Sequence, residues 1–381
     1  QGPRTPNNVF KVPTTCPTSP LLVRAAPTQP SAAPRRKASP RTTAVVLGDY
    51  GLGYSSAQAD ALRGLDVLFE ASPTEERKLA MIALRCFPVE ARRVTRVARS
   101  FNTVYRVEAP DGTYALRIGS PLQIHATGTA QAEAAWQRSL HNDGLAVPEV
   151  VETSSGESMV LVGDPEGRAR TCVLFTWIRG RSMRTRLAPP RARKLGQLMA
   201  RLHEHAAARR ADGVLRADRV LYWRLPDQLG DVPEHGKVLI EARDSVQLVI
   251  DDLWRRQPAG SPHLLHGDLT PANVIEAPGV GPVPIDFQDM VVGFAEQDIS
   301  FTLASFGRHH DRDGLTQSFR DGYSEVRTWP DVPQAVIRGL IVARGLHQLN
   351  LSLATAEGPL PREYLDHHAS RARAWLANGS G

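Results

Sequence analysis

The sequence predicts an α+β fold in which a small antiparallel sheet with one helix precedes a larger, mainly helical part. Three segments rich in β-branched residues, 92–98, 103–109 and 113–118, are separated by short turns, which is the pattern of a β-meander. Apolar residues later recur at helical spacing, most clearly over 336–353. With 381 residues, the chain is long enough for two packed lobes and a tail.

The first 43 residues differ in composition from the rest of the chain. They are rich in Pro, Ser, Thr and Ala, so they cannot bury enough apolar surface to offset the entropy of ordering. We therefore predict a disordered, basic tail over 1–43. Its acid-free start also resembles an organelle transit peptide, but the missing amphipathic helix favours a plain extension.

Residues 44–90 are predicted to form a helical extension. Apolar residues recur at helical spacing over 56–71. Ser72 and Glu75 then have the spacing of a capping box, which predicts the start of a second helix.

Residues 91–178 are predicted to form a small lobe. Beyond the meander, the pattern predicts a helix over 129–142. Strands over 147–152, 158–162 and 171–178 then complete the antiparallel sheet.

Residues 179–381 are predicted to form a larger lobe. Apolar residues from Leu195 to Leu202 share one face of a predicted helix, and 315–377 is predicted to be largely helical. The HHDRDG stretch at 309–314 is predicted to be a solvated turn rather than a metal site.

The stretch 264–298 carries polar residues at a spacing suited to phosphoryl transfer. Asp268 lies two positions after His266, and Asn273 and Asp286 follow. Moving a γ-phosphoryl group onto a hydroxyl needs one carboxylate to orient the hydroxyl and accept its proton, and oxygen ligands to hold Mg2+. Because Asp and Asn also suit turns, the interpretation rests on their combination.

Two short apolar strands, 274–276 and 283–287, are predicted to form a hairpin around a Gly- and Pro-containing turn. Such a hairpin folds Asp286 back toward Asn273. The two residues could then bind the same metal ion.

The motifs HGDLTPAN, IDFQD and QDIS together resemble those of the aminoglycoside phosphotransferase and choline kinase superfamily. The DFQD variant is similar to the homoserine kinase type II and stress response kinase branch. The resemblance implies a two-lobed protein-kinase-like fold and phosphoryl transfer from ATP, with Mg2+, to a small molecule or sometimes a protein. It also implies that Asp268 is the catalytic base, that His266 shapes its loop, and that Asn273 and Asp286 bind the metal.

On the nucleotide side, the resemblance implies that a cation on the third strand pairs with the phosphates and with a helix Glu. The matching residues are Arg117, where the family usually has Lys, and Glu133. An exposed strand Arg and a solvated helix Glu are the alternative interpretations.

The same resemblance places further residues of the small lobe around the nucleotide. The turn between the first two strands, with Ser100 and Asn102, is expected to cover the phosphates although it lacks Gly. Phe175 and Thr176, in the strand that leads to the hinge between the lobes, are expected beside the adenine.

Two charged residues of the larger lobe are singled out as supports of this site. Asp298 matches the family's structural Asp that braces the catalytic loop. Arg344 lies in an apolar helix, where a charge is costly unless it is paired. We expect it to pair with active-site acids or, alternatively, to contact the substrate.

Composition excludes several other classes of protein. Hydrophobic residues make up 41% and charged residues 23%, as in globular proteins, and no apolar run approaches the roughly 18 residues of a membrane span. The three cysteines have no CxxC spacing, which argues against disulfides and zinc and for the cytoplasm. His203 and His205, two positions apart, are assigned no metal role.

The net charge of +6 is a property of the tail. Residues 1–48 hold seven Lys and Arg and no acid, and without them 39 basic residues face 40 acidic ones, a net charge of −1. A specific nucleic-acid partner is therefore not predicted, and salt-sensitive binding through the tail is the only such alternative.

The expected partner is a small molecule that carries a hydroxyl. Two rivals remain open: a nucleotide-binding pseudokinase, because the strand Lys is absent, and a protein Ser/Thr kinase of the same superfamily. Homoserine, amino alcohols, aminoglycosides, sugars and protein Ser are all possible acceptors, because fold does not carry substrate identity.

Overall fold

The computed structural model describes 73–207, 209, 212–257, 261–307, 309–356 and 358–378. The chain divides into two compact units, Gln1–Ala44 and Val45–Gly381, and every described residue belongs to the second. The predicted tail, the predicted helix over 56–71 and the Ser72 cap lie outside the described residues.

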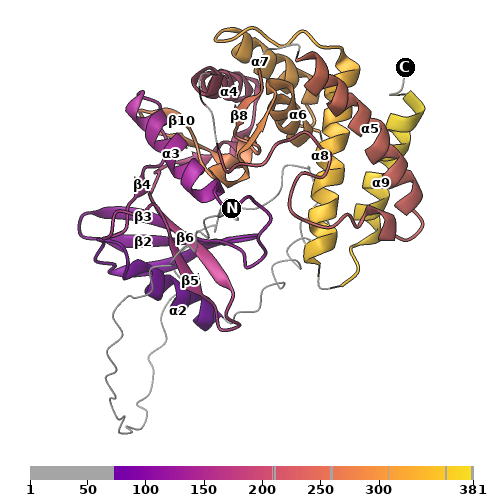
Figure 1. Cartoon of the computed structure of the whole chain (residues 1–381). Coiled ribbons are helices and arrows are strands. Elements are labelled where there is room, and N and C mark those ends of the chain that lie inside the picture. The colour runs from indigo at the N-terminus through magenta and orange to yellow at the C-terminus, as the bar shows by residue number, and fades with distance from the viewer. Residues whose placement is uncertain are drawn as a thin grey trace, which may run out of the picture. The chain divides into compact units, whose positions relative to one another are not determined.

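The small lobe contains a six-stranded antiparallel sheet (Figure 1). The strands follow the order β1-β2-β3-β6-β4, and β5 pairs with β6 as well. Their bounds are β1 Arg93–Arg99, β2 Thr103–Ala109, β3 Gly112–Ile118, β4 Val150–Val151, β5 Val160–Gly163 and β6 Ala169–Thr176. Each predicted strand of this lobe is present. Strand β4 is shorter than expected because Pro148 has no N–H to donate to the sheet.

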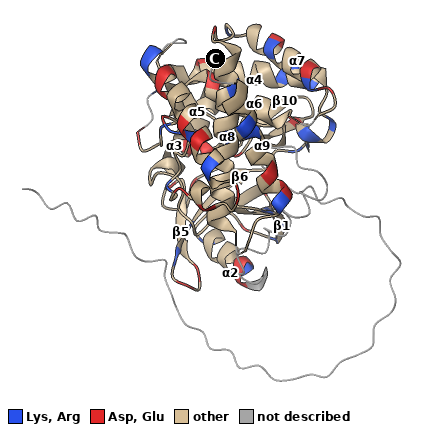
Figure 2. Ribbon diagram, turned by 90° about the vertical axis from the view of Figure 1, so that its right-hand side faces the viewer, with Lys and Arg blue, Asp and Glu red and all other residues tan. Residues whose placement is uncertain are grey.

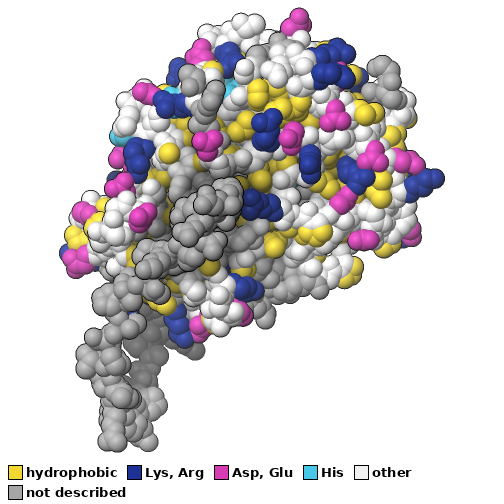
Figure 3. Space-filling model, viewed as in Figure 1, with side chains coloured by type: hydrophobic (Ala, Val, Ile, Leu, Met, Phe, Trp, Pro, Cys, Tyr) yellow, Lys and Arg dark blue, Asp and Glu magenta, His cyan; other side chains and the backbone are white. Residues whose placement is uncertain are grey.

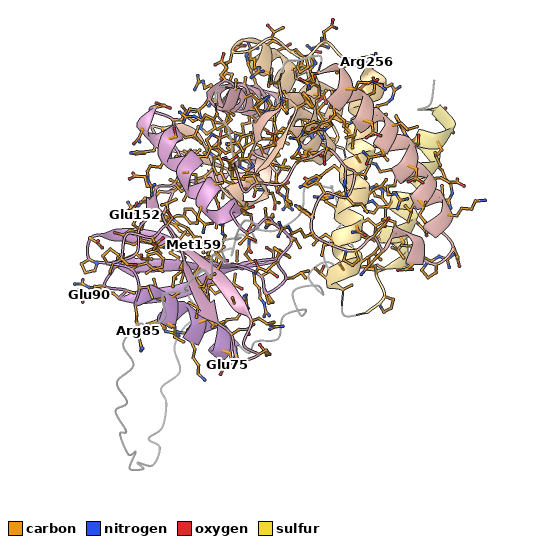
Figure 4. All side chains as sticks on the ribbon, in the orientation of Figure 1. Glu75, Arg85, Glu90, Glu152, Met159 and Arg256 are labelled. Carbon is orange, nitrogen blue, oxygen red and sulfur yellow. The ribbon has the colours of Figure 1, made fainter. Side chains whose placement is uncertain are left out.

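Helix α2, Pro73–Leu84, packs against one face of this sheet. Its Leu79 and Leu84 join Tyr105 and Leu116 in one buried cluster. Buried Glu76 accepts a hydrogen bond from Thr103 Oγ1 at 3.2 Å and lies 3.6 Å from the guanidinium groups of Arg96 and Arg99. The second predicted helix is therefore part of the small-lobe core. Glu75, Arg85 and Glu90 lie on the outer side of that lobe (Figure 4).

Helix α3, Thr129–Asn142, belongs to both lobes. Glu133 is buried toward the sheet side, whereas Trp136 and Leu140 join the main apolar cluster of the larger lobe. The Trp136 ring meets Phe287 edge-on at 5.3 Å between centroids. One helix thus carries a candidate nucleotide residue and part of the large-lobe core.

The larger lobe is mainly helical. In Figure 1, α5, α8 and α9 lie side by side and share one apolar cluster, while α4, α6 and α7 surround another. The helices are α4 Pro189–Ala207, α5 Gly236–Arg256, α6 Ala295–Ser305, α7 Arg312–Ser324, α8 Gln334–Thr355 and α9 Arg362–Asn378. None of the described helices is both long and apolar enough to cross a lipid bilayer.

The predicted turn at 309–314 is wrong in its second half. The Asp311 side chain accepts a hydrogen bond from Gly314 N at 3.2 Å, and this cap starts α7 at Arg312. Residues 312–314 are therefore the first turn of a helix.

Short strands carry the polar motifs of the larger lobe. They are β7 Arg181–Ser182, β8 His263–Leu265, β9 Val274–Ala277, β10 Gly281–Pro284 and β11 Val291–Gly293. The predicted hairpin is present, with Gly281 opposite Ala277 and Pro284 opposite Val274. The second strand ends earlier than predicted, because beyond the Ile285 N to Asn273 O bond it has no strand partner.

Charged side chains of both signs are interspersed over the described elements (Figures 2 and 3). The face drawn in Figure 3 shows basic and acidic groups next to one another between apolar patches. This distribution agrees with a nearly neutral folded body.

Helices α4 and α7 approach each other at two glycines. A Cβ atom on Gly196 would overlap the main-chain O of Phe319, and one on Gly322 would overlap the main-chain O of Arg193. Gly196→Ala is therefore expected to lower the free energy of unfolding by about 2–3 kcal/mol, measured by urea denaturation. Gly358→Ala, with open space around its Cβ position, is the matched control. Equal stability of the two variants would contradict this packing.

Candidate active site

The loop that carries His266 and Asp268 follows β8 and is held by a buried carboxylate. Asp298 accepts hydrogen bonds from the main-chain N–H groups of His266 and Gly267, both at 3.1 Å. His203 Nε2 lies 3.2 Å from the same carboxylate, and its Nδ1 lies 2.9 Å from Tyr323 Oη. Burial alone raises the pKa of Asp298, but the hydrogen bond and charge of His203 lower it below its usual range. Asp298 stays ionised and fixes the loop.

Gly267 lets the loop approach the segment that follows Asp286. Its φ is 78°, and a Cβ atom there would overlap the main-chain O of Asp289. His266 Nε2 lies 3.1 Å from the main-chain O of Ile285. His266 thus connects the two motif segments.

Asp268 is held through both carboxylate oxygens. Asn273 Nδ2 donates to Oδ2 at 2.7 Å, and Arg344 Nη2 donates to Oδ1 at 2.8 Å. Burial raises the pKa of Asp268 to about 7; Arg344 opposes the shift, and the nearby carboxylates of Asp289 and Asp286 add to it. The predicted pairing of Arg344 with an active-site acid is present.

Asp286 turns out of β10 in a left-handed conformation, with φ 63° and ψ 64°. Arg117 Nη1 donates to its Oδ1 at 3.2 Å, yet the side chain is still 38% exposed. Burial of the site raises the pKa of Asp286 to about 6; Arg117 opposes the shift, and Asp289 and Glu133 add to it. The carboxylate of Asp286 is therefore partly accessible, and it shares Arg117 with Glu133.

Arg117 and Glu133 form a bidentate ion pair. The Nη1 to Oε1 distance is 2.9 Å and the Nη2 to Oε2 distance is 2.5 Å. Both residues are buried, which rules out an exposed strand Arg and a solvated helix Glu. The guanidinium also lies over the Phe175 ring at 5.2 Å from its centroid. A Lys ammonium could not present this planar fork.

Asn102 connects the turn between β1 and β2 to the segment that follows β10. Asn102 Nδ2 donates to Gln288 Oε1 at 2.6 Å, and Asn102 Oδ1 accepts from Ser120 N at 3.2 Å. Ser100 N donates to the main-chain O of Asn102 at 2.8 Å. The side chain of Asn102 is thus engaged within the protein, and phosphate contacts by Ser100 and Asn102 stay predictions.

Thr176 lies at the end of β6, where its Oγ1 accepts a hydrogen bond from Glu149 N at 2.9 Å. Phe175 is buried beneath Arg117. Their predicted position beside adenine stays a prediction.

Sequence reasoning missed a second set of residues beside Asp268. His125 Nε2 lies 2.8 Å from Asp289 Oδ1; although burial alone raises the pKa of Asp289, this hydrogen bond and the charge of His125 lower it. The His347 ring stacks on Tyr222 at 4.0 Å between centroids, and Trp223 lies 3.9 Å from it. The only sequence signal was the position of Asp289 within DFQD.

The oxygen atoms near the hairpin fit a magnesium ion that shares its shell with phosphates. Asn273 uses its amide nitrogen on Asp268, which leaves the amide oxygen as an acceptor, and Asp286 is accessible. Among the described residues, no group of three or more His, Cys, Asp or Glu could hold an ion alone. Mg2+ commonly uses one or two carboxylates plus phosphate oxygens and water. Burial is the main cause of the raised pKa values of Asp268 and Asp286, and the nearby carboxylate of Asp289 adds to both shifts.

Solved structures share this fold. A microcompartment-associated aminopropanol kinase superposes with a TM-score of 0.63 at 24% identity, over 80% of this chain and 98% of that one. An amicoumacin kinase in complex with AMP-PNP and Ca2+ gives 0.64 at 18% identity, over 82% and 94%. An aminoglycoside phosphotransferase from Alicyclobacillus acidocaldarius gives 0.50 at 17% identity, over 78% and 94%. The predicted two-lobed, protein-kinase-like fold is confirmed.

Sequence comparison gives the family. A search of curated proteins found no match. A family model described as the phosphotransferase enzyme family matches residues 94–333, which span both lobes and every motif residue from Arg117 to Asp298. The chain belongs to the phosphotransferase enzyme family.

Proposed function

We propose that the protein transfers the γ-phosphoryl group of ATP to a hydroxyl group of a small molecule, with Mg2+ as cofactor. The observation that carries this proposal is the buried Asp268, held by Asn273 and Arg344 next to an accessible Asp286 that is linked to the Arg117–Glu133 pair. The names of two structural neighbours, a kinase of aminopropanol and one bound to AMP-PNP, support a small acceptor and an adenine nucleotide.

In this mechanism Asp268 orients the acceptor hydroxyl and takes its proton. A bond forms between the hydroxyl oxygen and the γ-phosphorus, the bond from that phosphorus to the bridging oxygen breaks, and ADP leaves. Asn273 and Arg344 fix the carboxylate, so that the hydroxyl meets it in one orientation. Arg117, held by Glu133, positions the nucleotide phosphates. Bound Mg2+ would supply charge neutralisation on the phosphate oxygens, with Asn273 and Asp286 as its protein ligands.

Two measurements on the wild-type protein test this function. Mg-ATP is expected to raise the unfolding temperature, and ADP release across a panel of hydroxyl compounds is expected to depend on the acceptor. Binding without transfer to any compound would favour the pseudokinase alternative, and transfer to protein Ser or Thr alone would favour the protein kinase. An unfolding temperature that Mg-ATP does not change would contradict all three nucleotide-based functions.

The pH dependence of turnover follows from the raised pKa of Asp268. A base must be ionised, so kcat/KM is expected to rise with pH up to about 7 and to level off above it. Steady-state rates between about pH 5.5 and 8.5, with the Kd of Mg-ATP measured at each pH, separate catalysis from nucleotide binding. A flat profile over this range would show that the pKa of Asp268 lies well below about 7.

A further inference from the structure

Arg344 is a buried guanidinium whose hydrogen-bonding capacity is largely unused. Its side chain is 2% exposed, and its Nη2 donates to Asp268 Oδ1 at 2.8 Å. Its only other polar contact among the described residues is a long one, 3.5 Å from Nη1 to Tyr222 Oη. A guanidinium has five N–H donors. Arg344 therefore makes one hydrogen bond of ordinary length.

The Arg344–Asp268 pair differs in geometry from the buried Arg117–Glu133 pair of the same site. Arg117 meets Glu133 with both terminal nitrogens, whereas Arg344 meets Asp268 with only one. If neutralising Asp268 were the whole task of Arg344, the same fork geometry would serve it best. A buried guanidinium with free donors is costly, and the part of the chain that the structure describes offers these donors no further partner.

The surroundings of Arg344 are largely aromatic. The Trp223 and Phe301 rings lie 5.6 and 4.7 Å from the guanidinium carbon. His347, one turn along α8, is neutral, because burial and the charge of Arg344 hold its pKa well below the usual range. Neither His347 ring nitrogen makes a hydrogen bond of good geometry, although an interaction with the main chain of Val220 partly opposes the fall in its pKa.

The other nearby acid, Asp289, is already engaged by His125. An acceptor rich in ammonium groups would place them against the Arg344 guanidinium, which is unfavourable. An acceptor with a carboxylate would instead fill its free donors. At Arg344 itself, the unused donors therefore favour an acceptor group that carries negative charge and accepts hydrogen bonds.

We propose that Arg344 is a specificity-determining residue of the acceptor site and that it selects a small hydroxy acid. The carboxylate of the acceptor binds the free N–H groups of Arg344 while its hydroxyl lies on Asp268. Because Nη2 remains on Asp268, the two groups are bound side by side, so the acceptor is compact. The carboxylate is unchanged in the reaction, and the proton and phosphoryl group move as in the proposed phosphotransfer, on which this inference rests.

Matched acceptors that differ only in the carboxylate test the proposal on the wild-type enzyme. L-serine is compared with ethanolamine, and glycerate with ethane-1,2-diol, by ADP release with Mg-ATP. The carboxylate member of each pair is expected to have a kcat/KM at least about 100-fold higher, because its absence leaves buried donors unpaired. Equal or better turnover of the amino alcohol or diol overturns the inference and leaves the phosphotransferase function standing.

Substitutions of Arg344 test whether this residue causes the preference for acceptors with a carboxylate. Arg344→Met is expected to reduce the preference within each pair to less than about tenfold, mainly through KM, and Arg344→Lys to keep part of it. Arg338→Met removes an exposed arginine of the same helix and is expected to change nothing. A uniform loss of kcat for all acceptors would show that Arg344 only positions Asp268. Should Arg344→Met fail to fold, the wild-type pairs decide alone.

If no compound is turned over, binding is measured instead, as the thermal shift that glycerate or L-serine causes in the Mg-ATP complex. No saturable shift with either carboxylate overturns the inference, whereas a missing response to Mg-ATP itself overturns the proposed function.

Discussion

Asp268→Asn is expected to lower kcat by about 100- to 10,000-fold while the Kd for Mg-ATP stays within about threefold of the wild-type value. The amide has nearly the shape of the carboxylate but cannot take the proton of the acceptor. Both neighbours of Asp268, Asn273 Nδ2 and Arg344 Nη2, are donors, so the amide also loses one of the two hydrogen bonds that orient this side chain. The proposed nucleotide contacts lie on the Arg117 side and are expected to be retained.

The measurement combines acceptor-dependent ADP release with direct titration of Mg-ATP. Asp313→Asn, an exposed carboxylate in the first turn of α7, is the matched control with the same loss of charge. Full turnover by Asp268→Asn with the true acceptor would remove Asp268 from its role as base. Loss of nucleotide binding together with turnover would point to damage of the loop instead.

Asp286→Asn is expected to raise the Mg2+ concentration for half-maximal activity by about tenfold or more and to lower kcat about 100-fold. The change removes the accessible negative charge of a proposed metal ligand and keeps the size of the side chain. Arg117 would retain Glu133, its shorter and bidentate partner, so the strand cation stays in place. The expected defect is therefore in metal binding rather than in folding.

Activity as a function of free Mg2+ at saturating ATP separates these effects. The unfolding temperature without nucleotide shows whether the variant is intact, and Asp313→Asn again controls for charge. An unchanged Mg2+ dependence would mean that Asp286 serves Arg117 and does not bind the metal.

The parts of this protein that sequence could predict depend on local pattern. The meander, α3 and the β9–β10 hairpin follow from alternation, helical spacing and turn residues within short windows. Because the hairpin is local, it also brings Asp286 near Asn273, as Ile285 N bonding to Asn273 O shows. A charge in the apolar helix α8 predicted a buried partner for Arg344, and Asp268 is that partner.

The remaining features depend on packing between distant segments. Tyr222 and Arg344 lie 122 positions apart, and only the approach of α8 to the loop after α4 makes them neighbours. No window of sequence contains that information. The hydrogen bond between Asn102 and Gln288, 186 positions apart, could not be predicted for the same reason.

The boundary between the lobes in the sequence does not separate two independent cores, because helix α3 packs into both lobes. A fragment ending at residue 178 would carry Trp136 and Leu140 into water, and its complement would lose the same apolar contacts. Neither fragment would have a complete apolar core. The segment between the lobes is where the backbone passes from one lobe to the other, but the chain cannot be cut there into two parts that fold independently. The described parts of the two lobes should therefore melt in one transition rather than as separable modules.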